Sequence, residues 1–275
     1  LLFEGPAEAL TLTTNTQPAI LTVSVMAWAA LREAIPNLRV AYAAGHSLGE
    51  FSALVAAGAL DLDDAIPLVR DRGAFMQSAV PVGEGAMVAC LEGPGPVTAL
   101  VEAVRAEGTH GVLDLANFNG PTQTVISGSA AAVARAREIG AEYGVKKMIP
   151  LDVSAPFHSS LMQPAQDRFA TRLADVPINP FSFPVVTNLE AAPNDQPDRV
   201  REILTRQITS PVRWTEICQY LLDAGCDTFI ECGTGTVLSN MLKRGWKDAV
   251  ITCLNVSDTA TLAATVEALK EHSHV

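Results

Sequence analysis

The stretch Gly45-His46-Ser47-Leu48-Gly49-Glu50 follows a short β-prone run over residues 38–43 and precedes a helix of small residues over 51–57. It fits the pattern G-x-S-x-G, in which a serine sits on a sharp turn between a strand and a helix with its hydroxyl exposed. We expect the flanking glycines to be needed because a Cβ would crowd the turn. The backbone N–H of Leu48 and the N-terminus of the helix would favour negative charge that develops near Ser47.

The rest of the chain alternates between helical and β periodicity, which is typical of an α/β protein. Residues 86–150 show the order strand, helix, strand, strand, helix, strand, which is the ferredoxin-like βαββαβ arrangement. We therefore predict a large α/β-hydrolase-like domain with a parallel sheet, made of residues 1–85 and 151–275, and a small ferredoxin-like domain inserted at 86–150.

Two helix starts contain prolines. One helix is expected to open at Thr16, which would cap it, with Pro18 in its first turn. Another is expected after Asp61, where Pro67 would kink the helix or delay its start.

Composition excludes several classes of protein. Of the 275 residues, 48% are hydrophobic and 18% are charged, which supplies a packed core and argues against disorder. The net charge is −11 and no local basic stripe occurs, so we expect no nucleic-acid binding. No apolar run reaches the roughly 18 residues of a membrane span. The five cysteines form no CxxC pair, so we expect reduced core thiols in a cytoplasmic protein and no metal site.

A nucleophilic serine needs a base, and the chain has five histidines. Three of them lie in a glycine-flanked loop or in the polar C-terminal tail: His110, His272 and His274. His46 is adjacent to Ser47, and neighbouring side chains at such a turn point apart, so we expect His46 to orient the turn. His158 follows a predicted strand, on the sheet edge where open α/β sheets bind ligands and where Ser47 also lies. The alternative for His158 is a surface histidine that caps a helix.

Six motifs then occur in order along the chain. They are GHSLGE at 45–50, RGAFMQ at 72–77, NFN at 117–119, PFHSSLM at 156–162, RQ at 206–207 with PVRW at 211–214, and ECGTG at 231–235. Together they closely resemble the malonyl-CoA:acyl carrier protein transacylases and the acyltransferase domains of fatty acid and polyketide synthases. The similarity covers nearly the whole chain, including the insert at 86–150.

The resemblance implies that Ser47 is the nucleophile and His158 the base. Members of the family use no third acid; the residue matching Gln207 offers a carbonyl oxygen to the other imidazole nitrogen. Arg72 would pair with the free carboxylate of a malonyl group, which its planar fork matches with two parallel hydrogen bonds. From the sequence alone, the alternative for Arg72 is an ion pair with a nearby aspartate: Asp61, Asp63 or Asp64.

Three further residues take weaker roles from the resemblance. Phe157 and Leu48 resemble the malonyl-selecting members, in which the bulk of Phe157 would oppose an α-methyl branch. Asn117 would help to hold the loops of the site.

The implied reaction moves a malonyl group from malonyl-CoA to Ser47 and then to the phosphopantetheine thiol of acyl carrier protein, in fatty acid or polyketide synthesis. We expect no permanently bound cofactor and a monomer. Carrier proteins are acidic, so docking requires a local basic patch. The candidate residues are Lys146, Lys147, Arg168, Arg172, Lys243, Arg244 and Lys247.

Two other functions remain open. A serine hydrolase or thioesterase of the α/β-hydrolase type also uses such a turn, but its histidine lies near the end of the chain. A catalytically silent carrier-protein-binding module is the second, because the family begins with a strand and a Gly-Gln-Gly-Ser-Gln loop that supplies a second oxyanion N–H. Nothing here matches that loop. The chain starts at Leu1 within the region that follows it, and we expect the segment to precede Leu1 in a longer chain.

Overall fold

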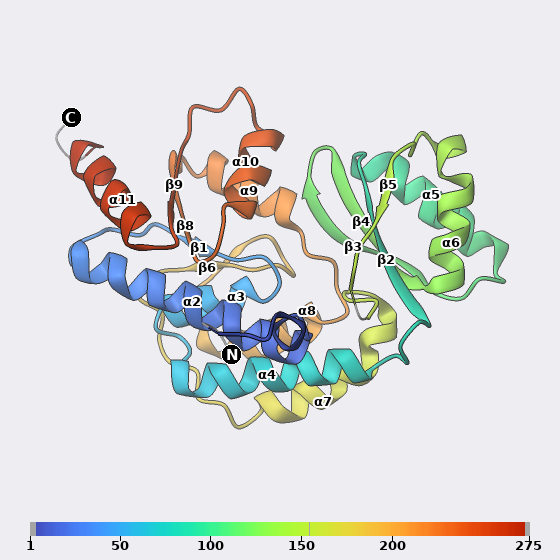
Figure 1. Cartoon of the computed structure of the whole chain (residues 1–275), viewed down its shortest axis with the longest axis horizontal. Helices are drawn as coiled ribbons and strands as arrows, with labels where there is room; N and C mark the ends of the chain where they lie inside the picture. Colours follow the sequence, from blue (N-terminus) through green and yellow to red (C-terminus); the bar gives the residue numbers. More distant parts are fainter. Residues whose placement is uncertain (1–3, 154, 273–275) are drawn as a thin grey trace.

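A computed structural model describes residues 4–153 and 155–272 of the chain, so His274 lies outside the described residues. The architecture is mixed α/β. Figure 1 shows a four-stranded sheet with two helices on one side of the molecule, and two smaller sheets with the remaining helices on the other side.

The turn between β1 (Ala43–Ala44) and α3 (Gly49–Ala56) holds Ser47 in a left-handed backbone conformation, with φ 50°. A Cβ at Gly45 would lie 2.0 Å from the carbonyl carbon and oxygen of Gly49, so only glycine fits there. A Cβ at Gly49 would meet nothing within 4 Å. The expectation that both glycines are required is therefore right for Gly45 and wrong for Gly49, which begins the helix facing open space.

Two small sheets lie beside this turn. β1 pairs in parallel with β6 (Val185–Val186), and β6 pairs antiparallel with β7 (Pro193–Asn194). β8 (Thr228–Cys232) and β9 (Thr252–Val256) form a separate parallel pair. The β-prone run over 38–43 forms a strand only at its end, because β1 is two residues long. Among the described residues β1 pairs only with β6, which is equally short.

The helix α2 (Thr13–Ala34) begins three residues before the expected start at Thr16, so Pro18 is its sixth residue and does not lie in its first turn. The short helix α1 (Ala7–Leu10) secures this end, because Thr16 Oγ1 donates a hydrogen bond to Leu10 O at 2.6 Å. Thr16 therefore ties α2 to the preceding segment and does not cap the helix.

The helix α4 (Leu62–Ser78) begins directly after Asp61, so Pro67 does not delay its start. Figure 1 shows α4 lying along α2, with α7 (Gln163–Leu173) beneath it. The core between these helices and α3 is apolar and includes Phe51 and Phe169, whose ring centroids are 6.0 Å apart.

The four-stranded sheet is antiparallel, in the order β3 (Leu113–Gly120), β4 (Gln123–Ser129), β2 (Gly85–Cys90) and β5 (Met148–Pro150). The helices α5 (Pro94–Glu107) and α6 (Ala130–Ile139) pack on one face, over a core that includes Leu100 and Ile126. A one-turn 3-10 helix, Gly140–Tyr143, follows α6. The other face carries Met87 and Val125 and packs against Phe157.

The edge strand β3 is joined by backbone hydrogen bonds to the segment that follows α8 (Pro197–Gln207). Phe118 N donates to Val212 O at 2.9 Å, and Val212 N donates to Ala116 O at 2.9 Å. The four-stranded sheet and the rest of the fold are thus connected by main-chain contacts at this edge.

The remaining helices surround β8 and β9, namely α9 (Trp214–Asp223), α10 (Val237–Gly245) and α11 (Thr259–His272). Within the described residues, every helix is too short or too polar to span a lipid bilayer.

Gly45→Ala is expected to destabilise the fold, because the new Cβ would overlap the backbone of Gly49. Overpacking of this kind costs about 1–3 kcal/mol of the free energy of unfolding, or more. Gly49→Ala is the matched control; we expect it to change that free energy by less than about 1 kcal/mol, toward greater stability, because alanine favours the helix. Urea unfolding followed by circular dichroism measures both variants. Equal destabilisation would contradict the steric argument.

Candidate active site

Ser47 and His158 are 111 residues apart in sequence, and Ser47 Oγ lies 2.8 Å from His158 Nε2. Ser47 stands on the turn between β1 and α3, and His158 stands on the loop between β5 and α7. Both residues have a left-handed backbone conformation, with φ 50° and 57°. Such conformations are uncommon for residues other than glycine and are found at sites where the surrounding structure holds them.

The second ring nitrogen fixes the tautomer of His158. Its Nδ1 lies 3.0 Å from Gln207 O and 3.1 Å from Ser210 O. Two carbonyl oxygens can only accept, so Nδ1 carries the hydrogen and Nε2 presents a lone pair to the Ser47 hydroxyl. The main-chain oxygen of Gln207 lies where the sequence analysis expected an acceptor.

His158 is electrically neutral in the ordinary pH range. Burial, followed by the positive charge of Arg72, lowers its pKa to about 3. The structure thus holds an imidazole with a free lone pair at the serine.

Arg72 is 1% exposed and meets the same serine. Its Nη2 donates to Ser47 Oγ and to Gln207 Oε1, each at 3.0 Å, and its Nη1 donates to Gln17 Oε1 at 2.7 Å. Burial lowers the pKa of Arg72 to about 10, so the guanidinium is charged at neutral pH.

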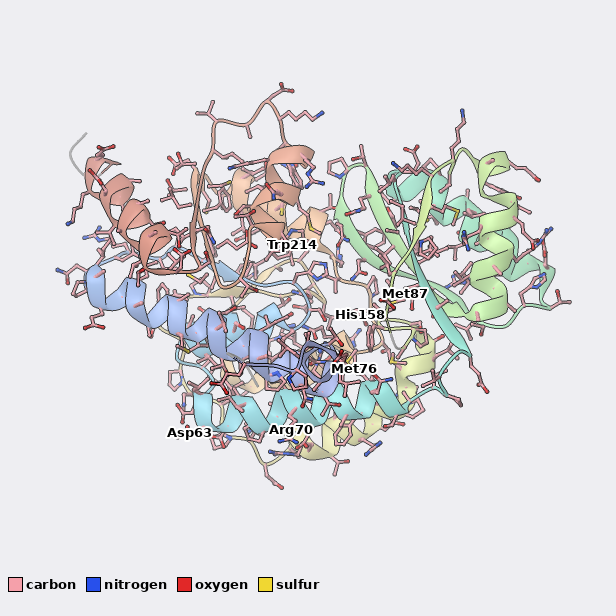
Figure 2. All side chains as sticks on the ribbon, in the orientation of Figure 1. Asp63, Arg70, Met76, Met87, His158 and Trp214 are labelled. Atoms are coloured by element: carbon pink, nitrogen blue, oxygen red, sulfur yellow. The ribbon has the colours of Figure 1, made fainter. Side chains whose placement is uncertain are left out.

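The alternative ion pair of Arg72 with a nearby aspartate does not form; among the described residues the guanidinium donates to Gln17, Ser47 and Gln207. Asp61 and Asp63 are exposed at the start of α4. Figure 2 shows Asp63 and Arg70 at the outer side of this helix.

A cavity of about 260 Å³ opens beside Ser47, His158 and Arg72. Its other walls are mainly apolar and come from α2, α4, β2 and the loop that carries His158. Figure 2 shows Met76, Met87 and His158 close to one another in the middle of the molecule. The apolar side chains that line the cavity are Ile20, Leu48, Met76, Met87, Leu151, Val153 and Phe157.

The other expected site residues lie at or next to this cavity. Leu48 and Phe157 line it, as does Asn117, whose backbone also bridges to Val212. His46 also lines it; its Nε2 is 2.8 Å from Asn119 Oδ1, and its ring lies 5.8 Å from that of Trp214. Burial lowers the pKa of His46, which makes it a neutral partner for the Asn119 amide.

Sequence reasoning missed Asn188, whose side chain is hydrogen-bonded to the main chain of the Ser47 turn. Its Oδ1 accepts from Ser47 N at 2.6 Å, and its Nδ2 donates to Gly45 O at 2.7 Å. Asn188 follows the carboxyl end of β6, and the rule that ligands bind at the carboxyl ends of strands could have singled it out.

Gln17, Ser210 and Glu50 were also missed as parts of the site. Gln17 and Ser210 lie outside the motifs, and their contacts with Arg72 and His158 depend on tertiary packing. Glu50 belongs to the GHSLGE motif, but the sequence assigned it no contact.

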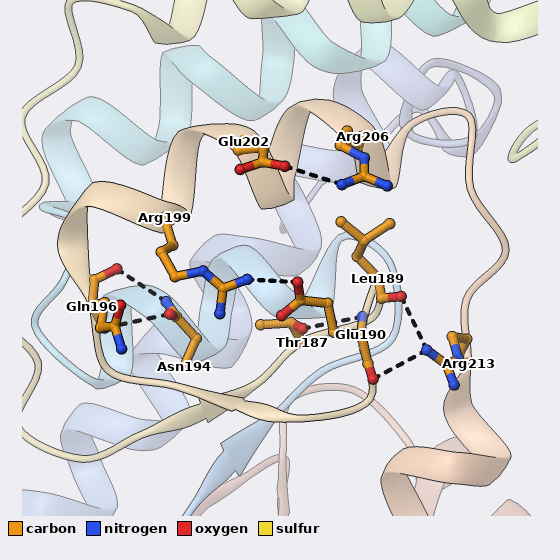
Figure 3. A network of polar contacts seen from close by, with 9 residues as sticks. All are labelled: Thr187, Leu189, Glu190, Asn194, Gln196, Arg199, Glu202, Arg206 and Arg213. Atoms are coloured by element: carbon orange, nitrogen blue, oxygen red, sulfur yellow. Dashed lines mark hydrogen bonds and ion pairs between the residues drawn. The ribbon is translucent and has the colours of Figure 1, made fainter.

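The loop after β6, which carries Asn188, is itself tightly held (Figure 3). Arg199 Nη2 donates to Glu190 Oε1 at 2.6 Å, and Arg213 Nη1 donates to Glu190 O at 3.1 Å. Glu190 N also donates to Thr187 Oγ1 at 3.3 Å. Asn188 therefore reaches the Ser47 turn from a rigid support.

Comparison with known proteins agrees with this geometry. The chain is 43% identical over 274 residues to the malonyl CoA-acyl carrier protein transacylase of Bacillus subtilis, covering 99% of this chain and 84% of that protein. Among solved structures, the malonyl CoA-acyl carrier protein transacylase of Coxiella burnetii superposes with a TM-score of 0.91 at 36% identity, over 97% of this chain and 83% of that one.

A third similar structure is that of a type II polyketide synthase acyl-carrier protein in complex with its malonyl-transacylase. It has a TM-score of 0.90 and 38% identity, and it covers 96% of this chain and 84% of that one. The acyl transferase domain family matches residues 1–272. With a family match over almost its whole length and relatives at this level of identity, the chain belongs to the acyl transferase domain family, which confirms the resemblance found in the sequence.

Proposed function

We propose that this protein transfers a malonyl group from malonyl-CoA to the phosphopantetheine thiol of acyl carrier protein, through an acyl-enzyme on Ser47, in fatty acid or polyketide synthesis. The observation that carries the proposal is the meeting of Ser47 Oγ, His158 Nε2 and Arg72 Nη2 in one buried cavity. The names of the similar proteins support the substrate and the partner.

In the first step, His158 Nε2 takes the proton of Ser47 as Oγ attacks the thioester carbonyl carbon. The oxyanion that forms would face the N–H of Leu48, to which no described residue offers an acceptor, and the N-terminus of α3. The C–S bond then breaks, and the proton on Nε2 passes to the leaving sulfur. Coenzyme A departs as the free thiol.

The second step reverses these roles. The phosphopantetheine thiol gives its proton to His158 Nε2, and its sulfur attacks the acyl-serine ester. When the ester C–O bond breaks, the proton returns to Ser47 Oγ. The carbonyl oxygens of Gln207 and Ser210 would stabilise the imidazolium in both steps, without a buried carboxylate. The covalent intermediate implies ping-pong kinetics.

Arg72 would bind the free malonyl carboxylate. Its Nε is buried without a partner among the described residues, so the guanidinium retains a donor for a substrate. In the free protein, the charge of Arg72 also lowers the pKa of His158. A carboxylate paired with Arg72 would neutralise that charge and make His158 a stronger base, so the diacid substrate would activate the site as it binds.

Phe157 would oppose an α-methyl branch on the acyl group. Its ring lines the cavity and packs against the apolar face of the four-stranded sheet that carries Met87. A branched acyl chain would have to displace this packed side chain, which favours the unbranched malonyl group.

The two-domain organisation is part of the proposal. The order β3-β4-β2-β5, with α5 and α6 on one face, supports a ferredoxin-like domain at 86–150. The parallel pairing of β1 with β6 and the turn at Ser47 support an α/β-hydrolase-like domain made of 1–85 and 151–275. The five cysteines are free, which supports a reducing cytoplasm.

Labelling tests the acyl-enzyme directly. Incubation with radiolabelled malonyl-CoA is expected to place the label on Ser47, and Ser47→Ala should abolish labelling while Ser78→Ala, an exposed control, retains it. Steady-state transfer by Ser47→Ala should fall by about 10⁴-fold or more. The absence of label on the folded wild-type protein would overturn the proposal. Release of the label to water faster than to pantetheine would instead indicate a hydrolase.

Arg72→Ala is expected to lower malonyl transfer about 10- to 100-fold more than acetyl transfer, because only malonyl has a carboxylate to pair with the guanidinium. Both rates should fall by some common factor, since Arg72 also donates to Ser47 Oγ. Arg70→Ala, on the exposed side of the same helix, is the control. The measurement is kcat/KM for both acyl-CoA substrates, and equal losses would remove the carboxylate-pairing role.

Carrier-protein docking is expected to depend on the cations at the end of α10. None of the described ion pairs includes Lys243, Arg244 or Lys247, whereas Arg172 is paired with Asp71. The KM for carrier protein should rise with salt, and more steeply than the KM for malonyl-CoA. Replacing these three cations with alanine should raise the KM for carrier protein and flatten its salt dependence. Parallel salt responses of the two KM values would argue against a basic docking patch.

A further inference from the structure

Glu50 is a buried carboxylate beneath the Ser47 turn. It lies in the first turn of α3, and it is 1% exposed. Its Oε2 accepts two hydrogen bonds, from Asn188 N at 2.9 Å and from the Gln207 side-chain amide at 2.7 Å. One oxygen atom thus holds two groups that belong to different parts of the site.

The first group, Asn188, connects Glu50 with the nucleophile Ser47. Glu50 holds the backbone of Asn188, and the side chain of Asn188 binds Ser47 N and Gly45 O. The left-handed conformation of Ser47 is therefore braced by a hydrogen-bonded path that ends on Glu50.

The second group, Gln207, connects Glu50 with His158 and with Arg72. The side chain of Gln207 donates to Glu50 and to Ser47 O, and its Oε1 accepts from Arg72 Nη2. The main-chain oxygen of Gln207 accepts from His158 Nδ1. If Glu50 did not accept from the amide, the Gln207 side chain could turn its oxygen away from Arg72.

Two charged groups face Glu50. They are Arg72 on α4 and Glu190 on the loop after β6; the other groups packed against its carboxylate, Asn188 and Gln207, are neutral. Glu190 is paired with Arg199, as Figure 3 shows, so Arg72 is the main counter-charge of Glu50. The second oxygen of Glu50, Oε1, is buried without a partner among the described residues.

Burial raises the pKa of Glu50 to about 7, against the opposing effects of Asn188, Gln207 and Arg72. Most buried polar side-chain atoms in proteins have a hydrogen-bond partner. Glu50 leaves Oε1 without one among the described residues and places Oε2 where two parts of the site meet.

We propose that Glu50 is a positioning residue for acyl transfer, which holds the Ser47 turn through Asn188 and the Arg72 guanidinium through Gln207. This inference rests on the proposed function. Glu50 does not contact the reacting atoms; it fixes the residues that do.

Two variants separate its hydrogen bonds from its charge. Glu50→Gln keeps one acceptor oxygen of the same reach and removes the charge, whereas Glu50→Leu removes both. Glu202→Gln, an exposed position on α8, is the matched control. All variants are compared at equal concentrations of folded protein, which thermal unfolding and circular dichroism establish.

We expect Glu50→Leu to lower kcat/KM for malonyl-CoA about 100-fold, the loss typical of a small displacement of reacting groups. Acetyl transfer should fall less, because Gln207 would no longer hold Arg72 for the substrate carboxylate. Glu50→Gln should lose less activity than Glu50→Leu, and Glu202→Gln none. A residue that only stabilised the fold would leave the ratio of malonyl to acetyl transfer unchanged, and an unchanged ratio would overturn the proposal.

The pH profile gives a second readout that does not require Glu50→Leu to fold. His158 has a pKa of about 3 and stays neutral, so in the wild type kcat/KM is expected to fall as the pH drops through about 7, where Glu50 takes up a proton and its hydrogen bonds weaken. Glu50→Gln should remove this decrease of kcat/KM near pH 7. The same midpoint in Glu50→Gln would overturn the proposal.

Labelling distinguishes this failure from that of the proposed function. If wild-type Ser47 takes no label from malonyl-CoA, acyl transfer itself fails. If the wild type and folded Glu50→Leu take up label at the same rate, acyl transfer stands and only the role of Glu50 is wrong.

Discussion

The hydrogen bond between Ser47 Oγ and His158 Nε2 is the constraint around which this structure is arranged. It joins two residues that both adopt an unfavourable backbone conformation, on loops far apart in the sequence. Each such conformation costs on the order of 1–3 kcal/mol and persists only where its surroundings hold it. For Ser47 these surroundings are Gly45, which lets α3 approach the turn, and Asn188, which binds the main chain on both sides of His46. For His158 they are the carbonyl oxygens of Gln207 and Ser210.

Buried charge is distributed around this pair in an unusual way. The histidine has carbonyl partners, whereas the buried carboxylate, Glu50, lies on the far side of Gln207. A carboxylate in contact with His158 would raise its pKa and compete with a substrate for Arg72. By placing a neutral amide between Glu50 and Arg72, the fold retains a counter-charge for the guanidinium and leaves part of it free for a ligand.

The sequence was informative where local rules apply and less so where tertiary packing decides. The turn at Ser47 could be predicted because its residue pattern and its flanking elements are local. The reason given for His158 was wrong, because the strand before it, β5, lies in the four-stranded antiparallel sheet and not in the sheet of β1. The strand lengths could not, since the ladder of β1 depends on β6, which is more than a hundred residues away. The start of α2 was misplaced because α1 packs over it. Gln17 and the oxygen of Ser210 reach the site only through packing, and no local pattern distinguishes them from ordinary polar residues.

The backbone pairing of β3 with Val212 has a consequence for how the cavity can change shape. Val212 lies two residues after Ser210, whose oxygen helps to orient His158. The pairing therefore extends the four-stranded sheet into the segment that supports the imidazole. The wall that carries Met87 and the support of the imidazole are therefore parts of one continuous hydrogen-bonded ribbon along this edge. The same ribbon continues to the other end of the wall, because Leu151 N donates to Met87 O at 3.0 Å, so widening this wall for a long thiol arm would break main-chain hydrogen bonds. The orientation of the His158 imidazole is therefore coupled to the position of this wall.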